Sequence, residues 1–308
     1  MKKIIQLFDR RIKSLFTQAS SPTIERLVFE MKKSQYDLFN QSCNELGVSD
    51  RRYASHDIIV SLTTYGKRIW DVYLAIESIM QQTFKPNRIV LNLDNSFRDI
   101  ELPITIQRQI NRGLEINYCE DLKSFKKLIP TIQKYPDSAI ITIDDDIIYE
   151  IDLLERIIRN YNRFPTCIHA SRVLKMNVHN NVLGNYSTWR FNYDEYEPNK
   201  LIFLTGVGGT LYPPHSLPNE VLNKEKFMEL CPYADDVWFN AMAILNGTPI
   251  QKVQLRHSSG EDYVSNPYVQ DIGLCVENNS QTCGRNDIQI KKTFEYYGID
   301  KILGIKIL

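Results

Sequence analysis

Apolar residues follow two alternating periods along the chain from residue 56 onward. β-branched apolar runs such as DIIVSLTTY (57–65) and AIITIDDD (139–146) are typical of buried strands. Between such runs, apolar residues recur every three or four positions, which predicts helices that face a core. The predicted strands are residues 57–65, 87–95, 114–121 and 139–146, and the predicted helices are residues 69–82, 123–135 and 152–164.

Strands that alternate with helices predict βαβ units and therefore an α/β fold with a mostly parallel sheet. The second half is less regular, but residues 167–173, 201–214 and 248–255 still read as strands with loops. Residues 235–247 predict a helix that Gly247 closes as a C-cap.

Residues 1–55 differ in character, because they are polar, helical in pattern and without strand signals. In residues 2–16 the apolar positions form one stripe, and a break at Ser20–Thr23 precedes a second helix. The first helix either packs on protein or lies on an anionic membrane surface. We expect an N-terminal helical extension (1–55) and one larger domain (56–308), of which residues 56–164 are more regular than residues 165–308.

The composition narrows the function classes. The formal net charge is zero and the charged fraction is 24%, so nothing global favours nucleic acid as a partner. The six cysteines show no C-x-x-C spacing, which favours free thiols in a reducing cytoplasm, although Cys275 and Cys283 could close a loop. The N-terminus starts like a signal peptide, but its apolar run is broken at Asp9, so we do not expect one, and no run reaches the length of a membrane span.

Three consecutive aspartates end the strand predicted at 139–146. Alternation along a strand would place Asp144 and Asp146 on one side, about 7 Å apart, and Asp145 on the other. Two such carboxylates suit a hard divalent cation together with a hydroxylated ligand. The alternatives are a solvated turn with an aspartate N-cap and an aspartyl-phosphate phosphatase, whose signature Ile148 does not match.

Polar residues also collect at the carboxyl ends of the other predicted strands, which is where parallel sheets bind ligands. TTYGKR (63–68) could place hydroxyls, a ring and a cation against a base and phosphates, or it could be an ordinary turn. Asp94 ends the second strand. Lys123, Lys126 and Lys127 precede the aspartate strand, and one of them could face a diphosphate or all could be solvated.

Two segments of the second half add candidate residues. TGVGGTLY (205–212) has three glycines within four positions, which permits close backbone approach to a ligand or a structural bulge. Asp235 and Asp236 open a helix, where one of them suffices as a cap and the other could face a reacting centre. His257 could ligate a metal or a phosphate, or be structural.

The ordered set of these motifs resembles nucleotide-sugar glycosyltransferases of the GT-A fold. DDDIIYEID (144–152) is similar to the DDDIIYPPD segment of bacterial capsule α-N-acetylglucosaminyltransferases of the heparosan type, and DDVWFN (235–240) resembles more distantly a segment of exostosin-like transferases. The likeness covers roughly residues 56–260 and implies a GT-A glycosyltransferase domain (56–308) with a nucleotide-binding half (56–164) and an acceptor half (165–308). Gly66 and Lys67, and the missing double proline after Asp146, depart from the family pattern.

The resemblance implies a role for each matching position. Asp236, with Asp235, would be catalytic, facing the anomeric carbon or the acceptor hydroxyl. Mn²⁺ or Mg²⁺ would be held by Asp146 and Asp144, with His257 as the further candidate ligand. The nucleotide-sugar would contact Thr63, Thr64, Tyr65, Arg68, Asp94, Lys127, Asp144, Asp145, Gly208 and Gly209.

The function expected from these roles is a metal-dependent, retaining transfer of an N-acetylhexosamine or hexose from a UDP-sugar. The acceptor would be a surface-polysaccharide or lipid-linked glycan, as in capsule biosynthesis, and the enzyme would work in the cytoplasm or peripherally on the inner face of the membrane. The alternative is a non-catalytic sugar-nucleotide or glycan-binding subunit. A nucleotidyltransferase would show a Gly-rich phosphate loop after the first strand, which this sequence lacks.

Overall fold

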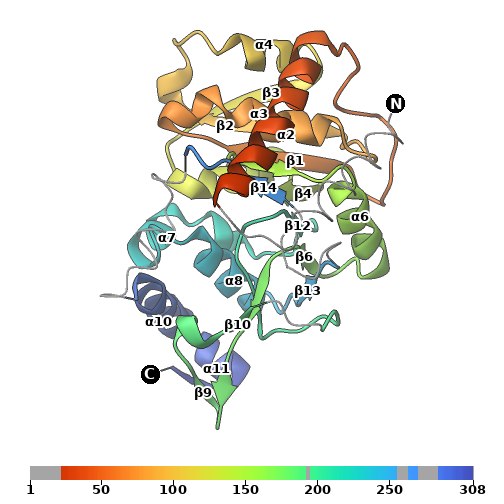
Figure 1. Cartoon of the computed structure of the whole chain (residues 1–308). Coiled ribbons are helices and arrows are strands. Elements are labelled where there is room, and N and C mark those ends of the chain that lie inside the picture. The colour runs from red at the N-terminus through yellow and green to blue at the C-terminus, as the bar shows by residue number, and fades with distance from the viewer. Residues whose placement is uncertain (1–21, 192–194, 255–262, 270–283, 308) are drawn as a thin grey trace.

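A seven-stranded sheet forms the centre of the protein in the computed structural model, which describes residues 22–191, 195–254, 263–269 and 284–307. Its strands are β1 (Ile58–Thr63), β2 (Arg88–Asp94), β3 (Leu114–Cys119), β4 (Ala139–Thr142), β6 (Ile168–Ala170), β12 (Thr210–Tyr212) and β13 (Ile250–Lys252). They lie in the order β13-β6-β12-β4-β1-β2-β3 (Figure 1). All neighbours are parallel except β12, which is antiparallel to β4 and β6. The predicted α/β class with a mostly parallel sheet is therefore confirmed.

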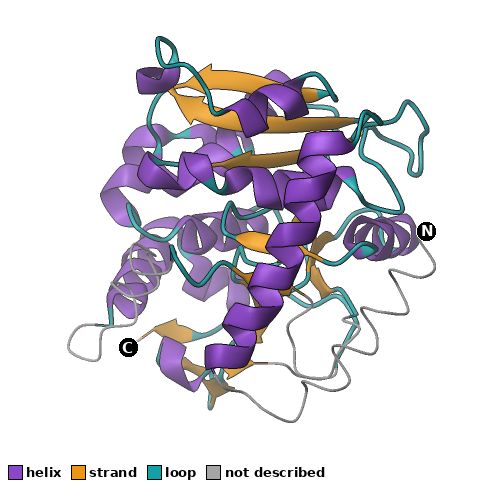
Figure 2. Ribbon diagram, turned by 45° about the horizontal axis from the view of Figure 1, so that its top comes forward, coloured by secondary structure: helices purple, strands orange, loops and turns teal. Residues whose placement is uncertain are grey.

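Helices lie on both sides of the strands (Figure 2). One apolar core joins the sheet to the C-terminal helices, and a second joins it to the helices of the first half. The α-helices are α2 (Pro22–Ser42), α3 (Val72–Met80), α4 (Ile104–Ile110), α5 (Ile129–Lys134), α6 (Leu153–Arg163), α7 (Lys224–Leu230), α8 (Asp235–Leu245), α10 (Arg285–Tyr297) and α11 (Ile299–Leu303). The 3-10 helices are η1 (Gly66–Trp70), η2 (Asn95–Phe97), η3 (Lys123–Lys127), η4 (Tyr186–Thr188) and η5 (Asn219–Leu222).

Short strands outside the main sheet build three small sheets. The pair that matters for the site is β5 (Ile147–Tyr149) with β14 (Tyr263–Ser265). The other two are β10 (Arg190–Phe191) with β7 (Val173–Lys175) and β11 (Ile202–Leu204), and β15 (Lys306–Ile307) with β9 (Val182–Leu183) and β8 (Val178–His179).

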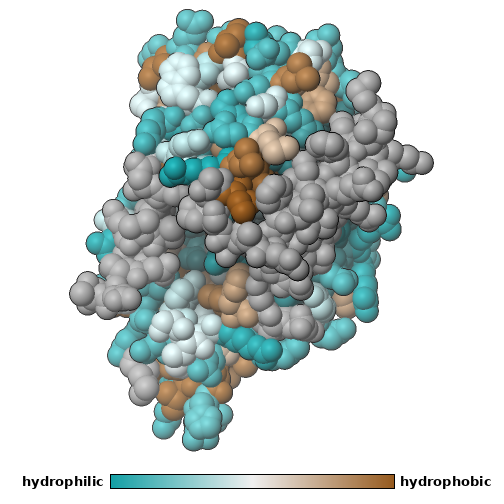
Figure 3. Space-filling model, viewed as in Figure 1, coloured by the Kyte–Doolittle hydropathy of each residue, from teal (hydrophilic) through white to brown (hydrophobic). Residues whose placement is uncertain are grey.

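The N-terminal part of the described chain is the long helix α2, which confirms the second predicted helix. It crosses the face seen in Figure 1 and packs on α3 and α4. Leu27, Met31 and Leu38 remain exposed on it, and the apolar patch near the centre of Figure 3 lies over its first turns. The first predicted helix (2–16) lies outside the described residues, and the division into 1–55 and 56–308 stays a prediction.

Most other elements match the sequence pattern. The strands and helices predicted between residues 57 and 164 are present, α8 ends at the predicted Gly247 turn, and Gly247 has a φ of +75°. Within the described ranges Cys43, Cys119, Cys167 and Cys231 are free thiols, whereas Cys275 and Cys283 fall outside them. Among the helices described, none is long and apolar enough to cross a membrane.

Candidate functional site

The predicted strand 139–146 is too long, and its aspartates do not continue it. The hydrogen-bonded strand β4 stops at Thr142, and Asp145 and Asp146 form a turn before β5. β5 leaves the main sheet because it pairs with β14 instead. Side-chain alternation therefore does not govern the triplet, and the prediction that Asp145 faces away from Asp146 is wrong: both side chains approach one guanidinium.

That guanidinium belongs to Arg68 of η1, which follows β1. Its Nη1 lies 2.7 Å from Asp145 Oδ1 and 3.3 Å from Asp146 Oδ2. Thr64 Oγ1 donates to the other oxygen of Asp145 at 2.6 Å. Burial lowers the pKa of Arg68, but the carboxylates of Asp145 and Asp146 outweigh it and raise that pKa. Thr64, Arg68 and Asp145 are all buried, so this group forms the inner wall of the turn.

Lys127 forms the second cationic centre and joins three distant parts of the chain. Its Nζ lies 3.0 Å from Asp235 Oδ2 and 3.8 Å from Asp144 Oδ1, and it donates to the carbonyl of Gly206 at 3.4 Å. Burial alone would lower the pKa of Lys127, but Asp235 and Asp144 raise it, so the ammonium stays charged. The residue that ends η3 therefore ties the end of β4 to the beginning of α8.

The glycine segment lies against these two groups. Gly206, Gly208 and Gly209 have φ angles of +69°, +83° and +100°, in the region that L side chains rarely adopt. A Cβ on Gly206 would stand 2.9 Å from Lys127 Nζ, and the amide of Gly208 donates to Asp144 Oδ2 at 3.3 Å. Gly209 instead approaches α6 through Leu153, so its need for glycine arises from packing.

Burial raises the pKa of three acids of this site, and for Asp145 it does so against the attraction of Arg68. Burial raises the pKa of Asp144 to about 7 against the attraction of Lys127, and the neighbouring acids add to the rise. Burial and then the charge of Asp235 raise the pKa of Asp236 to about 7, while Lys127 opposes the shift. Perturbed carboxyl groups of this kind cluster at functional sites.

The remaining predicted residues lie around these centres. Thr63 Oγ1 donates to the carbonyl of Asn92 within the sheet, and the half-exposed ring of Tyr65 packs on the Arg68 guanidinium at 5.2 Å. Asp94 accepts from the Ser96 amide and lies 3.4 Å from Lys126, in a separate ion cluster at the end of β2. His257 lies outside the described residues.

Sequence reasoning missed three contributors. Tyr149 donates its hydroxyl to Asp144 Oδ2 at 3.4 Å and accepts from the Asp144 amide at 2.8 Å. Arg172 follows β6 with its guanidinium over Phe191, and its charge lowers the pKa of Asp236. Tyr212 is buried on β12, and burial followed by the charges of Asp235 and Asp236 raises the pKa of its hydroxyl. Tyr149 stands within the segment 144–152 that carries the family resemblance, so that motif could have marked it, whereas Arg172 and Tyr212 reach the site only through the tertiary fold.

The donor set allows a test of the predicted metal. Within the described ranges no group of three or more His, Cys, Asp or Glu side chains has an arrangement that could hold a metal ion. Asp144 and Asp146 alone would still suit Mg²⁺ or Mn²⁺ of the kind bound by one or two carboxylates together with substrate phosphates. The local charge also favours a cation, since five carboxyl groups (Asp144, Asp145, Asp146, Asp235, Asp236) face three cations (Arg68, Lys127, Arg172).

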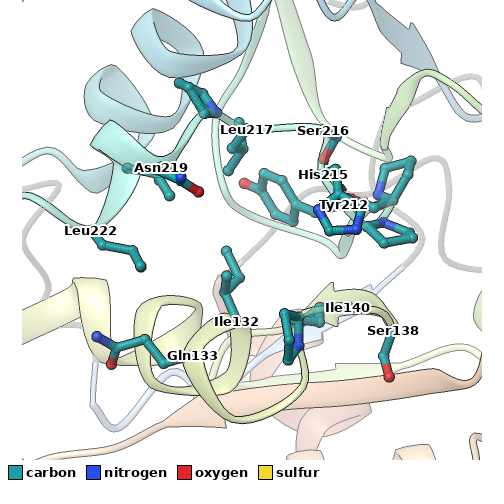
Figure 4. Close-up of a pocket in the computed structure, with 15 residues that line it drawn as sticks. Ile132, Gln133, Ser138, Ile140, Tyr212, His215, Ser216, Leu217, Asn219 and Leu222 are labelled. Atoms are coloured by element: carbon teal, nitrogen blue, oxygen red, sulfur yellow. Dashed lines mark hydrogen bonds between the residues drawn. The ribbon is translucent and has the colours of Figure 1, made fainter.

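A separate hollow of about 310 Å³ lies at the opposite end of β4 (Figure 4). Ile132, Ser138 and Ile140 line one side, and all three precede the carboxyl end of β4 in the sequence. Tyr212 and the proline-rich turn that follows it also line the hollow. Its walls are mostly apolar, and the acids described above do not line it. The chemistry is therefore concentrated at the carboxyl end of β4 rather than in this hollow.

No family model and no curated protein matches this chain. Among solved structures it is similar to crystal structures of S. aureus TarS at 15% sequence identity. TarS 1–349 in complex with UDP gives a TM-score of 0.44 over 79% of this chain and 72% of that one, and TarS 1–349 alone gives 0.45 over 82% and 75%. A third TarS structure gives a TM-score of 0.44, and the match covers 78% of this chain and 44% of that one.

Proposed function

We propose that this protein is a metal-dependent glycosyltransferase that moves a sugar from a UDP-sugar to a surface-polysaccharide or lipid-linked glycan. The observation that carries the proposal is the junction at Lys127, where Asp144 after β4 meets Asp235 at the start of α8. This contact brings the acidic pair of the second half to the strand-end acids of the first. A donor site and a reacting carboxyl group would then share one place.

Arg68 and Lys127 supply the positive charge that a diphosphate leaving group needs. Negative charge builds on the phosphate oxygens as the glycosidic bond breaks, and a preorganised cation stabilises it without rearrangement. Arg68 is held by Asp145, and Lys127 by Asp235. Both cations are therefore fixed in place before a donor arrives.

Asp146 and Asp144 are the residues that would hold Mn²⁺ or Mg²⁺. The ion would add charge stabilisation at the departing diphosphate. Without the ion, burial and mutual repulsion keep Asp144 partly protonated near neutral pH. The Gly208 amide and the Tyr149 hydroxyl hold the Asp144 carboxyl group in orientation.

Asp236 is our candidate for the group that faces the anomeric carbon or the acceptor hydroxyl. Its pKa of about 7 would let it accept a proton from an acceptor in an inverting reaction or stabilise an oxocarbenium-like centre in a retaining one. We favour retention, following the resemblance of the motifs. Activity should then rise as pH increases through about 7, because the ionised form serves either role.

The proposal is tested by measuring UDP release from a panel of UDP-sugars with Mn²⁺ and candidate glycan acceptors. We expect release from at least one donor, and a loss of about 100-fold or more for Asp236→Asn. Asp99→Asn, an exposed acid outside the site, is the matched control and should keep full activity. A glycan-binding subunit would release no UDP, and Asp236→Asn would leave its ligand binding unchanged.

A further inference from the structure

The segment Tyr263–Val269 contacts both the aspartate turn (Asp144–Asp146) and helix α2, and its strand β14 is labelled beside α2 in Figure 1. Its first three residues form β14, which pairs with β5 so that Ser265 lies opposite Ile147. The next amide, that of Asn266, donates to the carbonyl of Asp146 at 2.7 Å. The segment therefore fixes the backbone of the turn that carries the predicted metal ligands.

The same segment also holds Arg68. The Val269 carbonyl accepts from Arg68 Nη2 at 3.0 Å, while Nη1 of that guanidinium contacts Asp145 and Asp146. Arg68 and Val269 are both buried. A planar guanidinium with two anchored nitrogens has little freedom to rotate, so a shift of the Val269 carbonyl would pass directly to the two aspartates.

Tyr268 connects this segment to α2. Its ring meets the ring of Phe29 edge to face with 5.8 Å between centroids, and its hydroxyl hydrogen-bonds Glu30, which is the main cause of its raised pKa. Phe29 is 1% exposed and belongs to an apolar cluster with residues of α3 and with Ile148 of β5. Val264 of β14 packs against the same cluster.

We propose that Tyr268 is a positioning residue that couples helix α2 to the aspartate turn, so that donor binding depends on the placement of α2. The path runs from Phe29 through Tyr268 and the Val269 carbonyl to Arg68. The placement of helix α2 then affects the geometry of the donor site. The choice of ligand, UDP with Mn²⁺, rests on the proposed function. The coupling between α2 and the aspartate turn rests on the contacts in the structure alone.

The first test compares Tyr268→Ala with Tyr296→Ala, since both tyrosines are 53% exposed and neither change opens a core. Titration calorimetry with UDP and Mn²⁺ measures affinity. Loss of a group that orients metal ligands typically weakens binding about 10- to 100-fold, and we expect about tenfold for Tyr268→Ala and no change for Tyr296→Ala. Tyr268→Phe, which keeps the ring on Phe29, should recover most of the affinity.

The second test is hydrogen exchange of the peptide that spans residues 143–150, measured without ligand. Tyr268→Ala should speed exchange there, and Tyr296→Ala should not. Faster exchange together with weaker UDP binding supports the proposal, and unchanged exchange overturns it. If the wild type binds no UDP, the proposed function fails while the exchange result still decides the link. Equal UDP affinity in Tyr268→Ala and wild type overturns the dependence of donor binding on α2.

Discussion

Asp236 should make the protein less stable at neutral pH than its amide variant. Asp236→Asn keeps the shape of the side chain and an oxygen that can accept from the Val237 amide at 2.8 Å, but it removes the buried charge. The pKa of Asp236 is raised from 3.8 to about 7. The folded state therefore binds the proton more tightly than the unfolded state, and stability falls as pH rises from about 4 through about 7.

The size of the effect follows from the same shift. One pKa unit corresponds to about 1.4 kcal/mol, so full ionisation would cost about 4 kcal/mol. Because Asp236 is partly exposed, solvent screening reduces this, and we expect about 2 kcal/mol. In a domain of this size, a difference of about 2 kcal/mol raises the melting temperature of Asp236→Asn at pH 8 by about 4 °C.

Thermal unfolding monitored by circular dichroism, without metal or donor, measures the difference at several pH values. The gain of Asp236→Asn over wild type should be small near pH 4 and reach its full value above pH 7, whereas the exposed control Asp99→Asn should track the wild type throughout. A variant that is equally stable or less stable than wild type at pH 8 would refute the reasoning. It would mean that Asp236 is ionised without cost in the folded protein.

Three other changes test the site. Lys127→Met should reduce UDP release by about 100-fold, because Asp144 and Asp235 lose their shared cation, and by more than Lys126→Met at the neighbouring buried lysine. Gly206→Ala should reduce release more than Gly247→Ala: both glycines have positive φ, but a Cβ would meet Lys127 only at Gly206, and equal losses would argue against that contact. Chelation of divalent ions should stop release and Mn²⁺ or Mg²⁺ should restore it, whereas turnover that survives chelation would contradict the metal assignment.

The local pattern predicted the fold well because each strand and helix of the first half carries its own periodicity. The strands at 57–65 and 87–95 and the helix at 152–164 are present within a few residues. The turn at Asp145 was missed because its cause is remote: β5 pairs with β14, more than a hundred residues later, so the strand leaves the sheet. Long-range pairing of this kind leaves no trace in the local sequence period.

The motifs of the candidate site can be read from the sequence, but most of the contacts between them cannot. The polar strand ends, the glycines and the acidic pair are readable as motifs, and Asp144 and Asp235 do meet. They meet at the ammonium of Lys127. The sequence alone does not show that Lys127, rather than Lys123 or Lys126, makes these contacts. Lys126 and Lys127 are both buried, and the packing of η3 against the sheet decides that only Lys127 of the two reaches Asp144 and Asp235.

Asp145 shows how the structure changes a functional expectation. Alternation along a strand predicts that Asp145 faces away from the ligand or orients its neighbours, so that Asp145→Asn costs less activity than Asp146→Asn. The buried contacts of Asp145 with Arg68 and Thr64 instead predict that Asp145→Asn lowers the melting temperature measured by circular dichroism, because Arg68 then keeps only the longer carboxylate contact, with Asp146. Asp146, which is more exposed, should affect ligand binding first.

The central claim is that one site both binds a UDP-sugar and cleaves it. The most direct test is UDP release by wild type and Asp236→Asn at donor concentrations that give both proteins the same donor occupancy, as fixed by calorimetry. The proposal predicts that the variant binds the donor within a few-fold of wild type and releases UDP about 100-fold more slowly. Equal release rates at matched occupancy, or the absence of release from any UDP-sugar by the wild type, would contradict it.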